Sequence, residues 1–175
     1  WSTGRVTGLV RLSGTTFDVL VDVDTATPTV RHWGQPVGSI ADRDLLDAAL
    51  GRPVVAGALG TVAPLSIVPL HADGVVGRPG IAGRRGGGRA WAPRFAPLGH
   101  RINDGRLVVD ARDDVAGLAL TTVISVGDVL AVSVSITNIG DRRYSLDALT
   151  VTLPLADAAD ELLRFEGRWA REFQQ

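Results

Sequence analysis

Alternation of apolar with small or polar residues most constrains the fold of this 175-residue chain. Successive side chains of a strand point to opposite faces, so residues 129–137 predict a strand with one apolar side. The apolar row consists of Leu130, Val132, Val134 and Ile136. Residues 118–126 are a second strand candidate, and Gly127-Asp128 between the two stretches is typical of a tight hairpin connection. The pattern indicates antiparallel strands that cover a common core.

Several other stretches have strand character, and turn residues separate them. The candidates are residues 17–24, 29–33, 65–70, 107–110 and 149–155, the last with an inward row of Leu149, Val151, Leu153 and Leu155. A capping box at residues 39–42 predicts a short helix over residues 44–50. Closely spaced strands and turns favour a mainly all-β fold, an antiparallel β-sandwich or supersandwich with at most one or two short helices.

Composition excludes several classes of protein. A net charge of −1 argues against binding to nucleic acid or an anionic membrane, and no apolar run is long enough for a transmembrane helix. Without cysteine there is neither a disulfide framework nor a thiolate metal site. No signal peptide is visible, so we expect a cytoplasmic protein. The chain opens on Trp1 and has no Met, which predicts that it is part of a longer protein.

Residues 78–95 fit neither strand nor helix, because glycine and proline interrupt both. Arginines and two aromatic residues, Trp91 and Phe95, accompany them, as expected for a loop that presents side chains. The run Gly86–Gly88 predicts disorder between Arg84 and Arg89, and it lacks the sequence of a phosphate loop. Exposed aromatic residues favour contact with a sugar or a partner subunit, whereas a loop without a role or a contact with single-stranded nucleic acid are weaker alternatives.

No catalytic constellation is visible. The histidines His32, His71 and His100 lie in separate segments, so we expect no metal site and no cofactor. Asp22 and Asp24 would share one strand face, where paired carboxylates can act on sugars, but a solvated face is the stronger interpretation. The Asp113-Asp114 pair indicates a turn.

Four stretches resemble, in the same order, motifs of the N-terminal domain of glycoside hydrolase family 36 α-galactosidases. They are Arg31-His-Trp-Gly34, the glycine-rich run ending in Trp91-Ala-Pro-Arg-Phe95, Thr137-Asn-Ile-Gly140 with Leu153-Pro-Leu155, and Phe165-Glu-Gly-Arg-Trp169-Ala-Arg-Glu172. Ala90 and Ala92 depart from the family, which often has Asp and Ser at these positions.

The resemblance implies a multidomain, retaining enzyme that hydrolyses terminal α-D-galactosyl residues in galacto-oligosaccharides. Both catalytic aspartates of such an enzyme lie in a (β/α)8 barrel, which is absent from this chain. Residues 1–175 would then be a single N-terminal β-supersandwich domain, truncated at its C-terminal end. We expect it to be inactive alone, to contain no catalytic residue, and to pack on its own barrel domain.

The resemblance also assigns the Arg85–Phe95 loop a role in shaping the active site and a homo-oligomer, since such a loop reaches a neighbouring subunit in some relatives. Trp91 would supply an aromatic wall for the α-galactoside, and Arg89 and Arg85 would donate hydrogen bonds. Two alternatives remain open: an autonomous carbohydrate-binding β-sandwich, and a purely structural module that packs on the barrel. Under the last, Trp33 and Trp169 are core residues.

Overall fold

The computed structural model describes residues 8–36, 38, 65–155, 161, 166–168 and 171–174. The strands are β1 Leu9–Ser13, β2 Asp18–Asp22, β3 Thr29–Gly34, β4 Ile81–Arg85, β5 Ala96–Asn103, β6 Arg106–Asp113, β7 Leu118–Val126, β8 Leu130–Asn138, β9 Tyr144–Leu149, β10 Glu166–Arg168 and β11 Arg171–Gln174. The helices in these residues are two three-residue 3-10 turns, η1 His71–Asp73 and η2 Gly86–Gly88. The prediction of a mainly all-β, antiparallel fold with at most two short helices is therefore confirmed.

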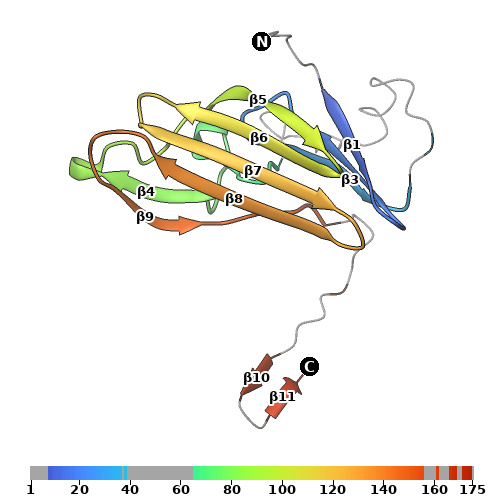
Figure 1. Cartoon of the computed structure of the whole chain (residues 1–175). Helices are drawn as coiled ribbons and strands as arrows, with labels where there is room; N and C mark the ends of the chain where they lie inside the picture. The colour runs from blue at the N-terminus through green and yellow to red at the C-terminus, as the bar shows by residue number, and fades with distance from the viewer. Residues whose placement is uncertain are drawn as a thin grey trace, which may run out of the picture.

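One layer of the sandwich is the sheet β5-β6-β7-β8, and two smaller sheets lie across it, β4-β9 near one end and β1-β2-β3 near the other (Figure 1). Within the large sheet every neighbouring pair is antiparallel. β10 and β11 form a separate antiparallel pair.

The hairpin of β7 and β8 confirms the alternation in the sequence. Every second side chain of β7 is buried, including Leu118, Leu120 and Ile124, and the residues between them are only half-buried. The apolar row of β8 packs half-buried against the core, and the intervening Ala, Ser and Thr residues are exposed. The turn at Gly127-Asp128 also lies where it was predicted.

β2 differs from the half-buried strand that its alternation predicts. It is the central strand of its sheet, and Asp18 is buried beside the fully buried Val19 and Leu20. The two carboxylates that follow stabilise the local backbone: Asp22 Oδ1 accepts the N–H of Asp24, and Asp24 Oδ1 accepts the N–H of Gly8, at 3.0 and 2.8 Å.

The β4-β9 sheet corrects two predictions. Residues 81–85 of the stretch that fits neither strand nor helix form β4, and β9 ends at Leu149, where the strand over residues 149–155 was expected to begin. A Cβ on Gly83 would lie 2.6 Å from the Tyr144 ring and 2.7 Å from the Ser145 carbonyl oxygen. This glycine therefore permits close strand contact rather than flexibility.

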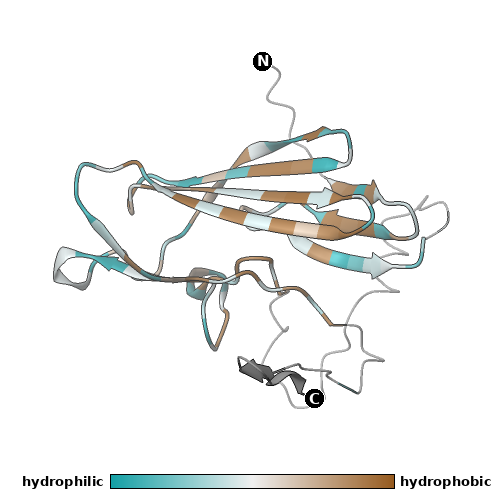
Figure 2. Ribbon diagram, turned by 60° about the horizontal axis from the view of Figure 1, so that its bottom comes forward, coloured by the Kyte–Doolittle hydropathy of each residue, from teal (hydrophilic) through white to brown (hydrophobic). Residues whose placement is uncertain are grey.

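The segment 65–70 forms no strand, contrary to expectation, but it connects the two small sheets. The Ile67 N–H donates to the Pro28 carbonyl, and the Ile67 carbonyl accepts the N–H of Thr152, at 2.8 and 2.9 Å. Its buried Ile67, Val68 and Leu70 join one apolar core with residues of both layers. Brown, apolar positions accordingly recur along the strands in Figure 2.

Two predicted elements lie outside the described residues, namely the capping box at residues 39–42 with its helix at 44–50, and Trp169. Trp33, expected as a core residue, is 42% exposed at the end of β3. Its indole N–H donates to the Pro154 carbonyl at 2.8 Å, which ties β3 to the segment after β9.

Candidate functional site

The Arg85–Phe95 loop begins with a closed turn rather than with disorder. The N–H of Arg85 donates to the Arg89 carbonyl at 2.7 Å, and the three glycines of η2 lie between them. Gly87 and Gly88 both have φ of 72°, in the left-handed region that disfavours residues with a Cβ. The triple glycine therefore provides the backbone conformation of a tight turn.

Arg85 fixes the base of this loop from inside the domain. Its Nε donates to the Ala116 carbonyl at 2.7 Å, and its Nη2 donates to the Gly117 carbonyl and to Asn138 Oδ1 at 3.0 and 2.8 Å. A fourth hydrogen bond joins Nη1 to the Arg142 carbonyl. One guanidinium thus joins β4 to the β6–β7 turn and to the β8–β9 turn.

Glycines make room for this guanidinium. A Cβ on Gly117 or Gly140 would lie 2.8 or 2.9 Å from Arg85 Nη2. Gly117 also has φ of 65°, so a substitution there would be strained as well as crowded. The guanidinium therefore packs against the glycine backbones of both turns. It also lies over the aromatic ring of Tyr144, with Arg85 Cζ 5.7 Å from the ring centroid.

Asp113 fixes the other end of the loop. Its carboxylate is buried and accepts the backbone N–H of Arg94 at 2.7 Å through Oδ2 and that of Ala116 at 2.8 Å through Oδ1. Phe95, next to Arg94, inserts its ring into the core and is only 8% exposed. Both ends of the loop are thus held by side chains that the domain itself supplies.

Ala90 lies between the two anchored ends in an unusual conformation. Its φ is 54°, and its carbonyl accepts the hydroxyl of Tyr144 at 3.4 Å. Burial raises the pKa of Tyr144 above its ordinary value, although the Arg85 guanidinium opposes this, so the hydroxyl keeps its proton at neutral pH. An Asp or Asn would occupy this left-handed position at lower cost than Ala90 does.

Trp91 follows Ala90 and is 61% exposed. The ring in contact with it belongs to His71 of η1, with the ring centroids 5.8 Å apart and the planes tilted by 55°. His71 is itself held, because its Nδ1 lies 3.1 Å from the Val75 carbonyl oxygen. The contact orients an exposed indole against a second anchored segment.

Asp73, also in η1, has a raised pKa. Partial burial raises its pKa above the ordinary value of 3.8, and the Arg94 guanidinium counteracts part of this rise. The folded chain therefore holds this proton to a higher pH than the unfolded chain does. The free energy of unfolding contributed by this group is greatest at low pH and is lost as the pH rises through the raised pKa.

We expect Asp73→Asn to raise the free energy of unfolding slightly at neutral pH, because an amide is not penalised by burial as a carboxylate is. The gain should shrink at about pH 4, where Asp73 of the parent chain is itself becoming protonated. Urea unfolding at both pH values measures this. A variant that is less stable at neutral pH would show that the Arg94 attraction outweighs burial.

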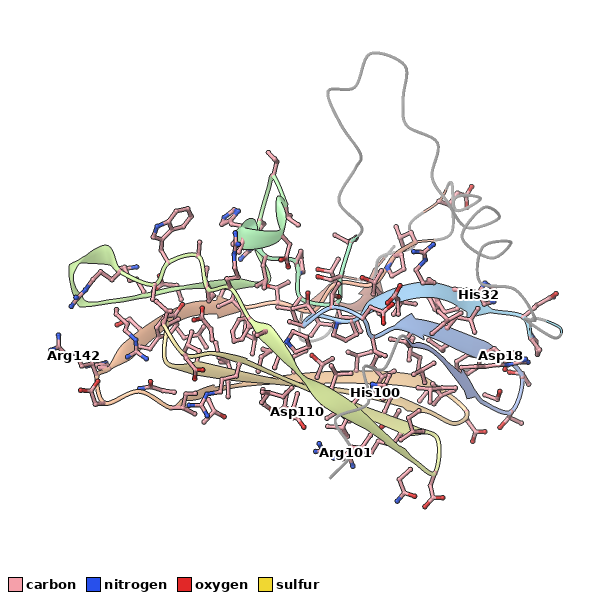
Figure 3. All side chains as sticks on the ribbon, turned by 90° about the horizontal axis from the view of Figure 1, so that it is seen from above. Asp18, His32, His100, Arg101, Asp110 and Arg142 are labelled. Carbon is pink, nitrogen blue, oxygen red and sulfur yellow. The ribbon has the colours of Figure 1, made fainter. Side chains whose placement is uncertain are left out.

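A cleft of about 520 Å³ lies behind the loop, where three turns of the sandwich meet. Its lining residues are Arg85, Arg89, Ala90, Ala92, Pro93, Asp113, Asp114, Val115, Ala116, Gly117, Gly140, Asp141 and Arg142. Figure 3 shows Arg142 at this end of the sandwich and Asp18 at the other. The volume is within the range of small-molecule sites, and the lining combines arginines and aspartates with small apolar residues.

The three sequence-predicted site residues separate in space. Arg85 and Arg89 line the cleft, whereas the aromatic partner of Trp91 is His71. The contact between His71 and Trp91 could not be predicted, because the two residues lie in separate segments and share no motif. Asp113 was predicted only as part of a turn, since the burial of an acidic residue gives no signal in sequence.

The three histidines lie in different parts of the described structure. His32, in β3, contacts the Gln35 carbonyl through Nε2, and His100 lies in β5 of the other layer (Figure 3). Within the described residues, no group of three or more His, Cys, Asp or Glu side chains could hold a metal ion. No helix in this part of the chain is long and apolar enough to span a membrane.

Fold and site define a β-sandwich module with an anchored, aromatic-bearing loop at one end. The model of the glycosyl hydrolase family 36 N-terminal domain matches residues 26–175. The chain belongs to this family, as its motifs predicted.

The chain is also similar to two known proteins, one in sequence and one in fold. An alpha-galactosidase of Escherichia coli is 31% identical over 166 residues, which make up 94% of this chain and 23% of that protein. The crystal structure of the alpha-galactosidase from Lactobacillus brevis has the same fold, with a TM-score of 0.74 at 17% identity over 94% of this chain and 26% of that one. The chain thus spans about a quarter of the length of these relatives.

Proposed function

We propose that this chain is the N-terminal domain of a retaining α-galactosidase acting on terminal α-D-galactosyl residues. In this proposal it contributes the Arg85–Phe95 loop to the active site of the assembled enzyme and leaves the chemistry to a barrel domain. Family membership and the names of the relatives support the substrate class. The observation that carries the role of the loop is an exposed Trp91 on a backbone anchored at both ends.

Anchoring supports a binding role because a prearranged aromatic surface loses little conformational entropy when a ligand packs on it. An indole face suits the apolar face of a sugar ring. Within the described residues, the side chain of Arg89 makes one hydrogen bond, a 3.4 Å contact from Nε to the Gly86 carbonyl, so its outer nitrogens can donate to hydroxyls. Arg85 uses its nitrogens within the domain, which makes it the support of the loop and leaves Trp91 and Arg89 as the proposed contacts.

The barrel that Trp91 would face belongs to the same subunit or to a neighbouring subunit of a homo-oligomer. Either arrangement gives the exposed indole a role that the isolated domain does not explain. It also makes the chain inactive by itself and dependent on assembly.

We expect Trp91→Ala in the full-length enzyme to raise the KM for raffinose about fivefold to tenfold, with kcat changed less than twofold. This range corresponds to the loss of one aromatic contact, worth about 1 kcal/mol. Trp91→Phe should restore most of the affinity. Steady-state kinetics on raffinose and on p-nitrophenyl α-galactoside measure both effects.

Val129→Ala is the matched control, because Val129 is 70% exposed in the β7–β8 turn at the opposite end of the sandwich. Its kinetics should equal those of the parent enzyme. An unchanged KM for Trp91→Ala would show that Trp91 does not contact the substrate. Saturable binding of galactose or raffinose by this chain alone would instead favour the autonomous carbohydrate-binding alternative.

A further inference from the structure

His71 is the ring in contact with Trp91, and it is held more firmly than a surface histidine usually is. It opens η1 directly after Leu70, which is 2% exposed in the core. The backbone of the turn is closed by the N–H groups of Asp73 and Gly74, which donate to the Leu70 and His71 carbonyls at 3.1 Å each. The imidazole therefore occupies a fixed position beside the exposed indole.

The hydrogen bond to Val75 determines which nitrogen of His71 carries the proton. A carbonyl oxygen only accepts, so the Nδ1 atom 3.1 Å from the Val75 carbonyl must be the donor. In the neutral ring this leaves a lone pair on Nε2. Among the described residues, Nε2 of His71 forms no hydrogen bond. Every buried side-chain nitrogen or oxygen there has a hydrogen-bond partner, so Nε2, which has none, is exposed to solvent.

We propose that His71 and Trp91 bind one neutral pyranose of the galactoside together. The indole packs against the apolar face of the sugar, and His71 Nε2 accepts a hydrogen bond from one of its hydroxyl groups. The pairing suits a sugar in particular, since a pyranose presents an apolar face edged by hydroxyl donors. This inference rests on the proposed function, because it needs Trp91 to face the substrate in the assembled enzyme.

The test combines His71 variants of the full-length enzyme with analogues of the disaccharide melibiose that lack one hydroxyl each. The parent enzyme should lose about tenfold in kcat/KM on one of these analogues, the expected loss for one hydrogen bond. His71→Asn keeps a donor near the Nδ1 position and loses Nε2, whereas His71→Phe keeps an aromatic ring and loses both nitrogens. Both variants should have a lower kcat/KM on melibiose than the parent enzyme. For each variant, kcat/KM should be the same on melibiose as on the one analogue that the parent enzyme discriminates against.

His71→Gln is the rescue variant, because its longer side chain can place an amide oxygen near the Nε2 position, and it should restore discrimination. His100→Ala, a histidine of β5 in the other layer, should behave as the parent enzyme. A merely structural role would lower kcat/KM on all analogues by the same factor, and that result would overturn the inference. Failure of the proposed function is a separate outcome, seen when Trp91→Ala leaves the KM unchanged.

Discussion

Arg85→Ala is expected to lower the free energy of unfolding of this chain by about 3 kcal/mol. The substitution removes four hydrogen bonds of the guanidinium and leaves the carbonyls of Ala116, Gly117 and Arg142 without that partner. It also removes the cation contact with the Tyr144 ring. Hydrogen bonds to a charged group contribute more to stability than neutral ones. Because the losses of neighbouring hydrogen bonds do not add fully, the expected total stays at about 3 kcal/mol. Urea unfolding followed by far-UV circular dichroism measures the change.

Arg84→Ala provides a control within the same strand. Arg84 pairs with Asp147 at 2.7 Å, but both side chains are more than half exposed, at 57% and 54%. An exposed pair of this kind contributes less than about 1 kcal/mol. Arg85→Lys should recover only part of the loss, because an ammonium group does not reproduce the planar fork that reaches both turns. Equal stability of the two Ala variants would refute the central role of Arg85.

The loss of the Arg85 hydrogen bonds should also affect the proposed substrate contact at Trp91. Arg85 joins β4 to both turns behind the loop, so Arg85→Ala would release the closed turn that precedes Trp91. We therefore expect the full-length variant to show a higher KM for raffinose, in the same direction as the effect expected for Trp91→Ala. Here the effect would act through loop position rather than through direct contact.

The sequence predicted the β7–β8 hairpin with near-correct ends because one alternating face is buried and the other is exposed. It failed where a strand is buried on both faces. The alternation in residues 17–24 predicted a half-buried strand, whereas β2 has buried apolar side chains on both faces and its Asp18 is only 2% exposed. A period-two pattern reveals a difference in polarity between the two faces of a strand, and a strand buried on both faces shows little such difference.

The β4-β9 sheet illustrates a second limit. Gly83 and the following glycines looked like a flexible loop because glycine lowers both helix and strand propensity. In the structure Gly83 permits the approach of Tyr144, and Gly87 and Gly88 adopt left-handed turn conformations. Composition does not distinguish these two uses of glycine from flexibility. The same holds for Arg85, whose inward role depends on two distant turns.

Asp113→Ala is expected to lower the free energy of unfolding by about 2 to 4 kcal/mol, although Asp113 forms no ion pair in the described part of the chain. Its buried carboxylate accepts two backbone N–H groups, at 2.7 and 2.8 Å, and both would lose their acceptor in a site 7% exposed. Unsatisfied buried N–H groups carry the full cost of lost hydration. Asp113→Asn should lose about half as much, because only one of its two terminal atoms accepts.

Asp114→Ala separates this effect from the general loss of an acidic residue in the β6–β7 turn. The Asp114 side chain is 77% exposed and pairs with Arg112, so its removal should change stability by less than about 1 kcal/mol. Amide hydrogen exchange adds a local readout. In Asp113→Asn the N–H groups of Arg94 and Ala116 should exchange faster, while those in the middle of β7 should not. Uniformly faster exchange would mean that Asp113 supports the whole sandwich rather than the end of the Trp91 loop.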